Sequence, residues 1–237
     1  MSKKLLILGL ILTFSLSLVA CSSKTATENE EVSDTNVETE VEATVDVEKK
    51  LIFADASWDS LRLHNAIAGY ILETAYGYEV DTMPGSSVNL MTGHAKGDVN
   101  VHMEQWPDNL PAYQTAVDSG DIIEVGVNFD DNAQGFYVPR YLIEGDEARG
   151  IKALAPDLKT VADLNKYPDL FPDEEDPGRS AVINAPPAYA AANIMEKKFE
   201  FYNLEKNFNL INPGSDSALS ASLSGAYEKG QPWVGYY

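Results

Sequence analysis

The order of hydrophobic and polar residues divides the chain into three segments. The first is apolar, with residues 5–19 following Lys3 and Lys4. The second, residues 22–50, consists mainly of Ser, Thr, Glu, Asp and Val, and it contains no aromatic residue, Gly or Pro. The third, residues 51–237, mixes apolar runs with polar turns in the way that a folded domain requires.

The third segment begins with an alternation of predicted strands and helices. Short apolar or alternating runs indicate strands at residues 51–54, 78–83, 98–103 and 122–127. Longer amphipathic or apolar stretches indicate helices at residues 60–76, 86–95 and 108–118. This alternation is typical of an α/β fold, in which a mostly parallel sheet has helices on both faces.

Polar residues and glycines mark the ends of the predicted helices. Ser57 or Asp59 suits the N-cap of the first helix, because its side-chain oxygen accepts a hydrogen bond from a free backbone N–H. Gly77 suits the left-handed residue that ends this helix. Ser86 or Ser87 is expected to start the second helix in the same manner.

The apolar first segment predicts an export signal over residues 1–21. Its core is too short to cross a bilayer comfortably, which favours a processed signal peptide over a permanent span. Residues 18–21 read Leu-Val-Ala-Cys and resemble the lipobox of bacterial lipoproteins. Cys21 is the only cysteine, so it has no partner for an internal disulfide. We expect Cys21 to carry a lipid anchor at the extracytoplasmic face of the cell membrane; the alternative is a signal peptide that happens to contain a cysteine.

The second segment predicts a tether. Residues 22–50 hold nine acidic residues and three lysines. Such a segment buries too little apolar surface to offset its ordering entropy, so we expect a disordered, self-repelling spacer. The whole chain has a formal net charge of −20. This charge argues against nucleic-acid binding, which requires a basic surface.

Two tryptophans follow predicted strands. Trp58 comes shortly after the strand at residues 51–54, and Trp106 comes shortly after the strand at residues 98–103. Ligands of α/β sheets bind at the carboxyl ends of the strands. An indole face attracts a cation by about 0.5–2 kcal/mol, and several rings together form a cage for a trimethylammonium group. We therefore expect a ligand site at these two residues; the alternative for each is ordinary core packing.

Several short motifs, in this order and spacing, resemble those of one family of transport proteins. They are Trp58-Asp59-Ser60, Gly85-Ser86-Ser87, Gly97–Glu104, Trp106–Asn109, Gln134–Pro139, Gly145-Asp146, Arg149–Ile151, Leu154–Lys159 and Tyr227–Tyr237. Together they are similar to the glycine betaine/proline betaine substrate-binding proteins of ABC importers. The resemblance extends from about Leu51 to the last residue.

The resemblance implies a fold and a function. The fold is an α/β, two-lobed periplasmic-binding-protein fold of type II, with lobe 1 expected at residues 51–138 and lobe 2 at residues 139–237. The function is the capture of glycine betaine or a related quaternary-ammonium osmolyte for an ABC permease and ATPase complex, without covalent chemistry. The alternative is a receptor of the same fold that presents its ligand to a membrane sensor.

The resemblance also carries over part of a ligand site. Trp58 and Trp106 match cage positions of the first lobe. Relatives often place another aromatic in a Pro-Gly-Trp-like loop of the second lobe, and the comparable stretch here, residues 184–189, offers Tyr189 instead. A tyrosine ring attracts cations more weakly than an indole, and its hydroxyl adds a donor. Tyr137, in the motif of residues 134–139, is also expected to bind ligand.

Two carboxylates bear on the choice of ligand. Asp59 and Glu104 stand beside the tryptophans, and an inward-facing carboxylate favours a cation such as choline over a zwitterion. The alternative for both is an N-cap or a solvated carboxylate. A ligand carboxylate would need donors, for which the backbone amides of residues 85–87 at a helix start are one option. With Tyr189 in place of tryptophan, carnitine, a sulfonium or a less methylated amine also remain alternatives.

Enzymatic readings find little support in the sequence. His102 and Glu104, with His94 nearby, are metal-ligand types, but no third ligand stands at a recognisable spacing. The sequence has no Gly-x-Ser-x-Gly elbow, P-loop or dinucleotide-binding fingerprint. We expect no catalysis, no cofactor and no metal site.

The end of the chain departs from the family pattern. Members usually continue beyond a Gly-Tyr-Tyr stretch and return to the first lobe, whereas this sequence stops at Tyr237. We therefore expect a C-terminal truncation and an incomplete second lobe. Trp233, Tyr236 and Tyr237 lie near the last predicted strand and either reach the cleft or pack in the core.

Overall fold

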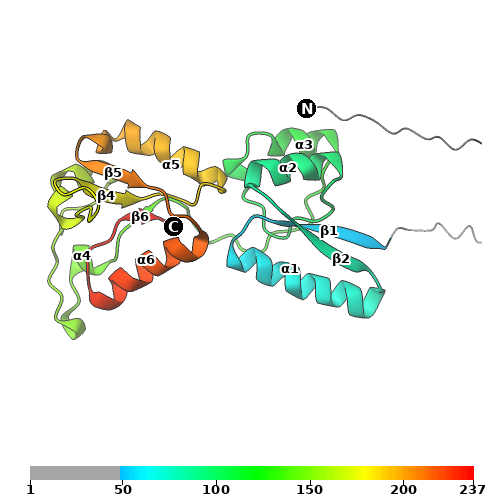
Figure 1. Cartoon of the computed structure of the whole chain (residues 1–237), viewed down its shortest axis with the longest axis horizontal. Helices are drawn as coiled ribbons and strands as arrows, with labels where there is room; N and C mark the ends of the chain where they lie inside the picture. The colour runs from blue at the N-terminus through cyan, green and yellow to red at the C-terminus, as the bar shows by residue number, and fades with distance from the viewer. Residues whose placement is uncertain (1–48) are drawn as a thin grey trace, which may run out of the picture. The chain divides into compact units, whose positions relative to one another are not determined.

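The computed structural model describes residues 49–237 (Figure 1). Its strands are β1 (Lys50–Asp55), β2 (Glu79–Pro84), β3 (Phe136–Tyr137), β4 (Ser180–Ile183), β5 (Phe208–Ile211) and β6 (Gly235–Tyr236). Its α-helices are α1 (Asp59–Ile71), α2 (Ser87–Lys96), α3 (Tyr113–Ser119), α4 (Tyr141–Glu144), α5 (Ala190–Phe201) and α6 (Asp216–Lys229). The predicted signal peptide, Cys21 and all but the last two residues of the predicted tether lie outside the described residues.

The first sheet consists of β1 and β2, which pair in parallel. Helix α1 packs on this sheet, where Leu61 is fully buried and the Asn65 side chain donates a 2.7 Å hydrogen bond to the Ala54 carbonyl. Gly69 allows the helix to approach closely, because a Cβ at this position would stand 3.3 Å from the Val80 side chain. The predicted strands at residues 51–54 and 78–83 are confirmed, with β1 beginning one residue earlier.

The second sheet has the order β3-β6-β4-β5. β3 runs antiparallel to β6, whereas β4 is parallel to both β5 and β6. Val182 and Phe208 are fully buried in its core. Gly235 fits between neighbours that leave no room for a side chain, since a Cβ there would lie 2.7 Å from the Trp233 ring. Because β3 pairs within this sheet, residues 136–137 belong with the elements that follow them, although the sequence assigned them to lobe 1.

The ends of two predicted helices follow local rules. Ser86 is the N-cap of α2, and its Oγ accepts a 3.3 Å hydrogen bond from the Asn89 backbone N–H. Helix α1 continues through a π-helical turn at Leu72–Tyr76 and ends at Gly77, whose φ is +70°. The prediction for the start of α1 was wrong: its N-cap is Trp58, and no side chain caps it.

Three predictions farther along were wrong in whole or in part. Residues 98–103 form no strand, and only Val101 bridges to Phe53 of β1. The predicted helix at residues 108–118 is split into a 3₁₀ turn at Pro107–Asn109 and α3, because Pro111 has no N–H to continue a helix. Residues 122–127 form no strand. Within residues 49–237, no helix combines the length and apolar character needed to span a membrane.

Candidate functional site

A strained turn positions Trp58 between β1 and α1. Ser57 has a φ of +78°, a left-handed conformation that a serine seldom adopts. Its N–H donates a 2.9 Å hydrogen bond to the Asp55 carboxylate, which also accepts a hydrogen bond from Arg62 at 3.1 Å. Such strain persists only where neighbours hold it, and here it directs the residue that follows.

The irregular segment after Val101 positions Glu104 and Trp106. Glu104 is buried, and its Oε1 accepts hydrogen bonds from the Ser60 hydroxyl at 3.1 Å and from the Trp106 indole N–H at 3.3 Å. Its Oε2 lies 3.4 Å from Nδ1 of His64, within ion-pair distance but without hydrogen-bonding geometry. Glu104 therefore ties the start of α1 to Trp106.

Tyr189 immediately precedes α5 and reaches two other elements. Its ring stands edge-on to Trp58, with ring centroids 5.2 Å apart and an interplanar angle of 82°. Its hydroxyl donates a 2.8 Å hydrogen bond to Oδ1 of Asp216, the first residue of α6. Burial, together with the Asp216 carboxylate, raises the pKa of Tyr189, so the hydroxyl remains a donor at ordinary pH. Tyr236 follows the same pattern, since burial and the Asp216 charge raise its pKa.

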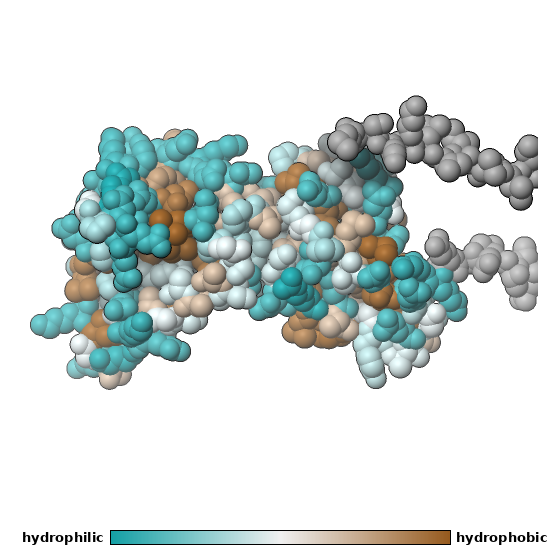
Figure 2. Space-filling model, in the orientation of Figure 1, coloured by the Kyte–Doolittle hydropathy of each residue, from teal (hydrophilic) through white to brown (hydrophobic). Residues whose placement is uncertain are grey.

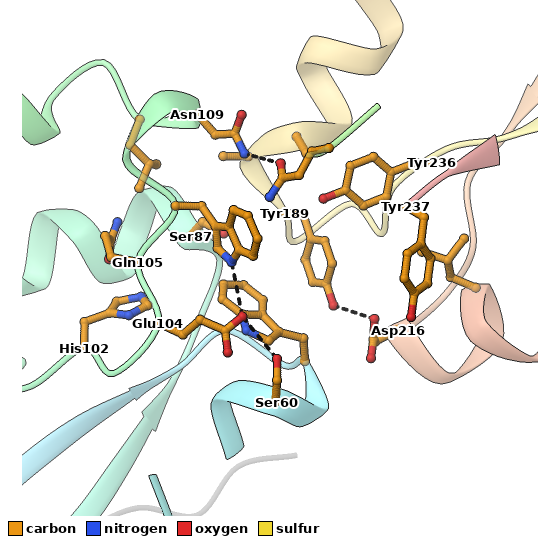
Figure 3. A pocket seen from close by; sticks show the side chains of 17 residues that line it. Ser60, Ser87, His102, Glu104, Gln105, Asn109, Tyr189, Asp216, Tyr236 and Tyr237 are labelled. Carbon is orange, nitrogen blue, oxygen red and sulfur yellow. Dashed lines mark hydrogen bonds between the residues drawn. The ribbon is translucent and has the colours of Figure 1, made fainter. Parts of the chain in front are cut away.

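These side chains surround one cavity of about 180 Å³ (Figure 3). Five of the described residues that line it are aromatic: Trp58, Trp106, Tyr189, Tyr236 and Tyr237. Its volume is below the range of about 300–1,000 Å³ for drug-sized ligands, so it suits a small solute.

The charges around the cavity have one sign. Glu104 and Asp216 line it, and no Lys or Arg occurs among its described lining residues. His102 also lines it. Burial, with a smaller contribution from the charge of His94, lowers the pKa of His102 to about 4, so that its ring is neutral near pH 7. Aromatic faces together with carboxylates are suited to a cation.

The predicted site residues do not all meet at this cavity. Trp58, Glu104, Trp106 and Tyr189 line it together. Asp59 is exposed at the start of α1 and does not line it, although its charge contributes slightly to the raised pKa of Tyr189.

Tyr137 also lies outside the cavity lining. It is 40% exposed on β3, where its ring stands edge-on to Tyr237 at 6.5 Å and its hydroxyl donates to the Ala133 carbonyl. Trp233 packs in the core, and its indole N–H donates to the Ser222 hydroxyl at 3.1 Å.

Two of the three backbone amides considered for a ligand carboxylate, those of Gly85 and Ser87, already have acceptors. The Gly85 N–H donates to the Asp55 carbonyl at 3.0 Å, and the Ser87 N–H donates to the Ala188 carbonyl at 3.1 Å. These two donors are therefore unsuited to a ligand without rearrangement.

Sequence reasoning missed Asp216 and left Tyr236 and Tyr237 undecided. Asp216 follows Ser215, which caps α6, so the sequence signals only a helix start at this point. Tyr236 lies on β6, in the interior of the second sheet, and Tyr237 follows it. No local pattern indicates that these three residues line the same cavity as Tyr189 and Trp58.

Comparison with known proteins identifies the family. The OpuAC family, the substrate-binding domain of the ABC-type glycine betaine transport system, matches residues 49–237. The chain belongs to this family. No curated protein matches the chain.

Solved structures show the OpuAC fold in this chain. The glycine betaine/L-proline-binding protein ProX from Borrelia burgdorferi has a TM-score of 0.59 at 16% identity, over 79% of this chain and 62% of its own. An ABC-transporter choline-binding protein in complex with choline has a TM-score of 0.59 at 18% identity, over 80% of this chain and 60% of its own.

Lactococcal OpuAC in its closed form with glycine betaine has a TM-score of 0.54 at 17% identity, over 79% of this chain and 64% of its own. The chain thus spans between 60% and 64% of the length of these three structures. Their shared α/β fold is that of periplasmic binding proteins, which confirms the predicted fold class.

Proposed function

We propose that this chain is the extracytoplasmic solute-binding component of an ABC importer and that it binds a small quaternary-ammonium solute in the cavity. The observation that carries the proposal is the aromatic lining, in which Trp58, Trp106 and Tyr189 surround a space of about 180 Å³ beside the buried carboxylate of Glu104. A methylated ammonium offers no hydrogen-bond donor, so aromatic faces bind it better than polar side chains do. Membership of the OpuAC family supports the same function.

The binding step follows from the arrangement of these rings. The methylated ammonium docks on Trp58 and Trp106, and Tyr189 completes the cage from the elements around the second sheet. The two predicted lobes, residues 51–138 and 139–237 with β3 counted in the second, then close on the ligand. This closure removes water from the cation. The closed surface is then what the permease of the importer recognises, and no catalytic step is required.

The position of the protein in the cell is part of the proposal. A lipid on Cys21 anchors the chain to the outer face of the membrane, and residues 22–50 act as the spacer between the anchor and the binding domain. Two or more acyl chains on one residue hold a protein at a membrane without inserting its folded part.

Replacing the tryptophans tests the proposed cage. Trp58→Ala and Trp106→Ala are each expected to weaken binding of a quaternary ammonium at least tenfold in calorimetric titration, because each ring contributes about 0.5–2 kcal/mol besides its contact area. Trp→Phe at either position is expected to lose less, since a smaller cation-attracting face remains.

The control is Phe201→Ala, which removes an aromatic side chain that is 77% exposed and outside the cavity lining. Its binding is expected to equal that of the unchanged chain. Unchanged affinity in both tryptophan variants, with circular dichroism showing that they are folded, would rule out the cage.

A further inference from the structure

The cavity differs from a general quaternary-ammonium site in its charges. Glu104 lines one part of it and Asp216 another, and Figure 3 shows the two carboxylates on separate sides of the aromatic rings. The lining residues that the structure describes include no Lys or Arg. A zwitterion such as glycine betaine brings its own carboxylate, and that carboxylate would meet two negative groups without a fixed positive charge.

No Lys or Arg of the described residues pairs with Glu104, and its nearest basic group is His64, whose Nδ1 lies 3.4 Å from Oε2 without hydrogen-bonding geometry. The Glu104 side chain is only 4% exposed, and its two hydrogen-bond donors, Ser60 and Trp106, are neutral groups. Oε2 accepts no hydrogen bond from the described residues. A buried carboxylate without a cation costs several kcal/mol, and a cationic ligand in the adjoining space offsets that cost.

Asp216 is the second carboxylate of the cavity lining, and its charge is stabilised by different groups. It occupies the first turn of α6, where the helix dipole stabilises a negative charge, and it accepts the hydroxyl of Tyr189. Its charge is thus held in place on the cavity wall rather than dispersed in solvent. Both carboxylates favour a ligand with a net positive charge.

Several donors near the cavity are occupied, although the Trp58 indole N–H in the lining has no hydrogen-bond partner among the described residues. The N–H groups of Gly85 and Ser87 donate to backbone carbonyls, and that of Asn89 donates to the Ser86 hydroxyl. The Asn109 side-chain amide at the cavity wall donates to Gln134 at 2.6 Å. A neutral end such as a hydroxyl needs fewer donors and can itself donate to a carboxylate.

We propose that the cavity selects a monocationic quaternary-ammonium alcohol of the choline type over zwitterions such as glycine betaine, and that Glu104 and Asp216 determine this preference. This inference rests on the proposed function, since it assumes that the cavity binds a methylated ammonium. It specifies the net charge of the preferred ligand and the residues that recognise this charge.

Paired titrations test the inference. The full-length chain in mild detergent is titrated calorimetrically with choline and with glycine betaine, and choline is expected to bind at least tenfold more tightly. Glu104→Gln and Asp216→Asn keep side-chain size and remove one charge each. Each is expected to weaken choline binding at least fivefold and to weaken glycine betaine binding less, so that the ratio of the two affinities falls.

The matched control is Glu200→Gln, an exposed position on α5 outside the cavity lining. It is expected to leave both affinities unchanged. Tighter binding of glycine betaine than of choline by the unchanged chain would overturn the inference and leave the proposed function standing, and no variant needs to fold for that result. Binding of neither solute by the folded chain would overturn the proposed function itself.

Discussion

At the scale of single residues, His102 shows how burial keeps one polar group of the cavity wall uncharged. Its Nδ1 is buried and has no hydrogen-bond partner among the described residues. Its ring centroid lies 6.5 Å from that of Trp58. Burial lowers the pKa of His102 to about 4, because protonation would place a charge where little water can solvate it.

The lowered pKa of His102 predicts a loss of stability in acid. Between pH 6.5 and about pH 4 the unfolded chain binds a proton at this residue and the folded chain does not. The free energy of unfolding contributed by His102 is therefore full above pH 6.5 and decreases as the pH falls towards 4, by about 1–3 kcal/mol in total. Denaturant unfolding at pH 7 and pH 4.5 measures it.

The variant His102→Gln isolates this contribution from those of the carboxylates. Its unfolding free energy is expected to change less between the two pH values than that of the unchanged chain. An equal pH dependence in both chains would contradict the assignment, as would an NMR titration that places the pKa of His102 near 6.5.

The site residues differ in how far the sequence predicts them. Trp58 and Trp106 are large aromatics that closely follow the first sheet's β1 and the Val101 bridge, so a rule about strand ends finds them. Tyr189 was predicted because residues 184–189 are comparable to a loop that carries an aromatic residue in the second lobe of relatives. Asp216 has no such signal, because a helix start predicts a capping residue and does not say what the next side chain faces.

At the scale of elements, the start of α6 supports the site. Ser215 is the N-cap, and its Oγ accepts a 3.1 Å hydrogen bond from the Ala218 backbone N–H. This cap fixes the first turn, which carries Asp216 and through it the Tyr189 hydroxyl. Loosening the turn is expected to disturb the cavity wall as well as the helix.

Removing this cap is predicted to cost stability. Ser215→Ala is expected to lower the free energy of unfolding by about 1 kcal/mol, because one of the free N–H groups of α6 loses its acceptor. Urea denaturation measures the change. Ser217→Ala, an exposed position in the same helix, is the matched control and is expected to change stability by less than about 0.5 kcal/mol. Equal effects from the two substitutions would argue against the cap.

Elements defined by local signals were predicted best. β1, α1, β2 and α2 have apolar runs of the right length and stop signals such as Gly77, and these four are present. Residues 122–127 show why the same reasoning fails elsewhere. Ile122 is buried, whereas Ile123 and Val125 are 81% and 97% exposed, and no described strand pairs with them. An alternating pattern makes a strand only when a neighbouring strand accepts its hydrogen bonds.

At the scale of the whole molecule, charge and fold are consistent with capture of a cation. The chain has a formal net charge of −20, and the face drawn in Figure 2 shows many hydrophilic residues with separate apolar patches. A negative field concentrates cations near the surface and does not determine which one binds. In the proposal made here, the selectivity comes from the cavity, where aromatic faces, the Glu104 and Asp216 carboxylates and the lack of Lys or Arg among the described lining residues act together.

The central claim is that the cavity recognises the positive charge of a methylated ammonium. The most direct measurement compares choline with its uncharged carbon analogue, 3,3-dimethylbutan-1-ol, in calorimetric titrations of the full-length chain. The two molecules have nearly the same shape, so their difference in affinity reports the attraction of the rings and carboxylates for charge. We predict that choline binds at least tenfold more tightly, because two indoles at about 1 kcal/mol each exceed the ~1.4 kcal/mol that a tenfold ratio requires. Equal affinities of the two compounds would contradict the account.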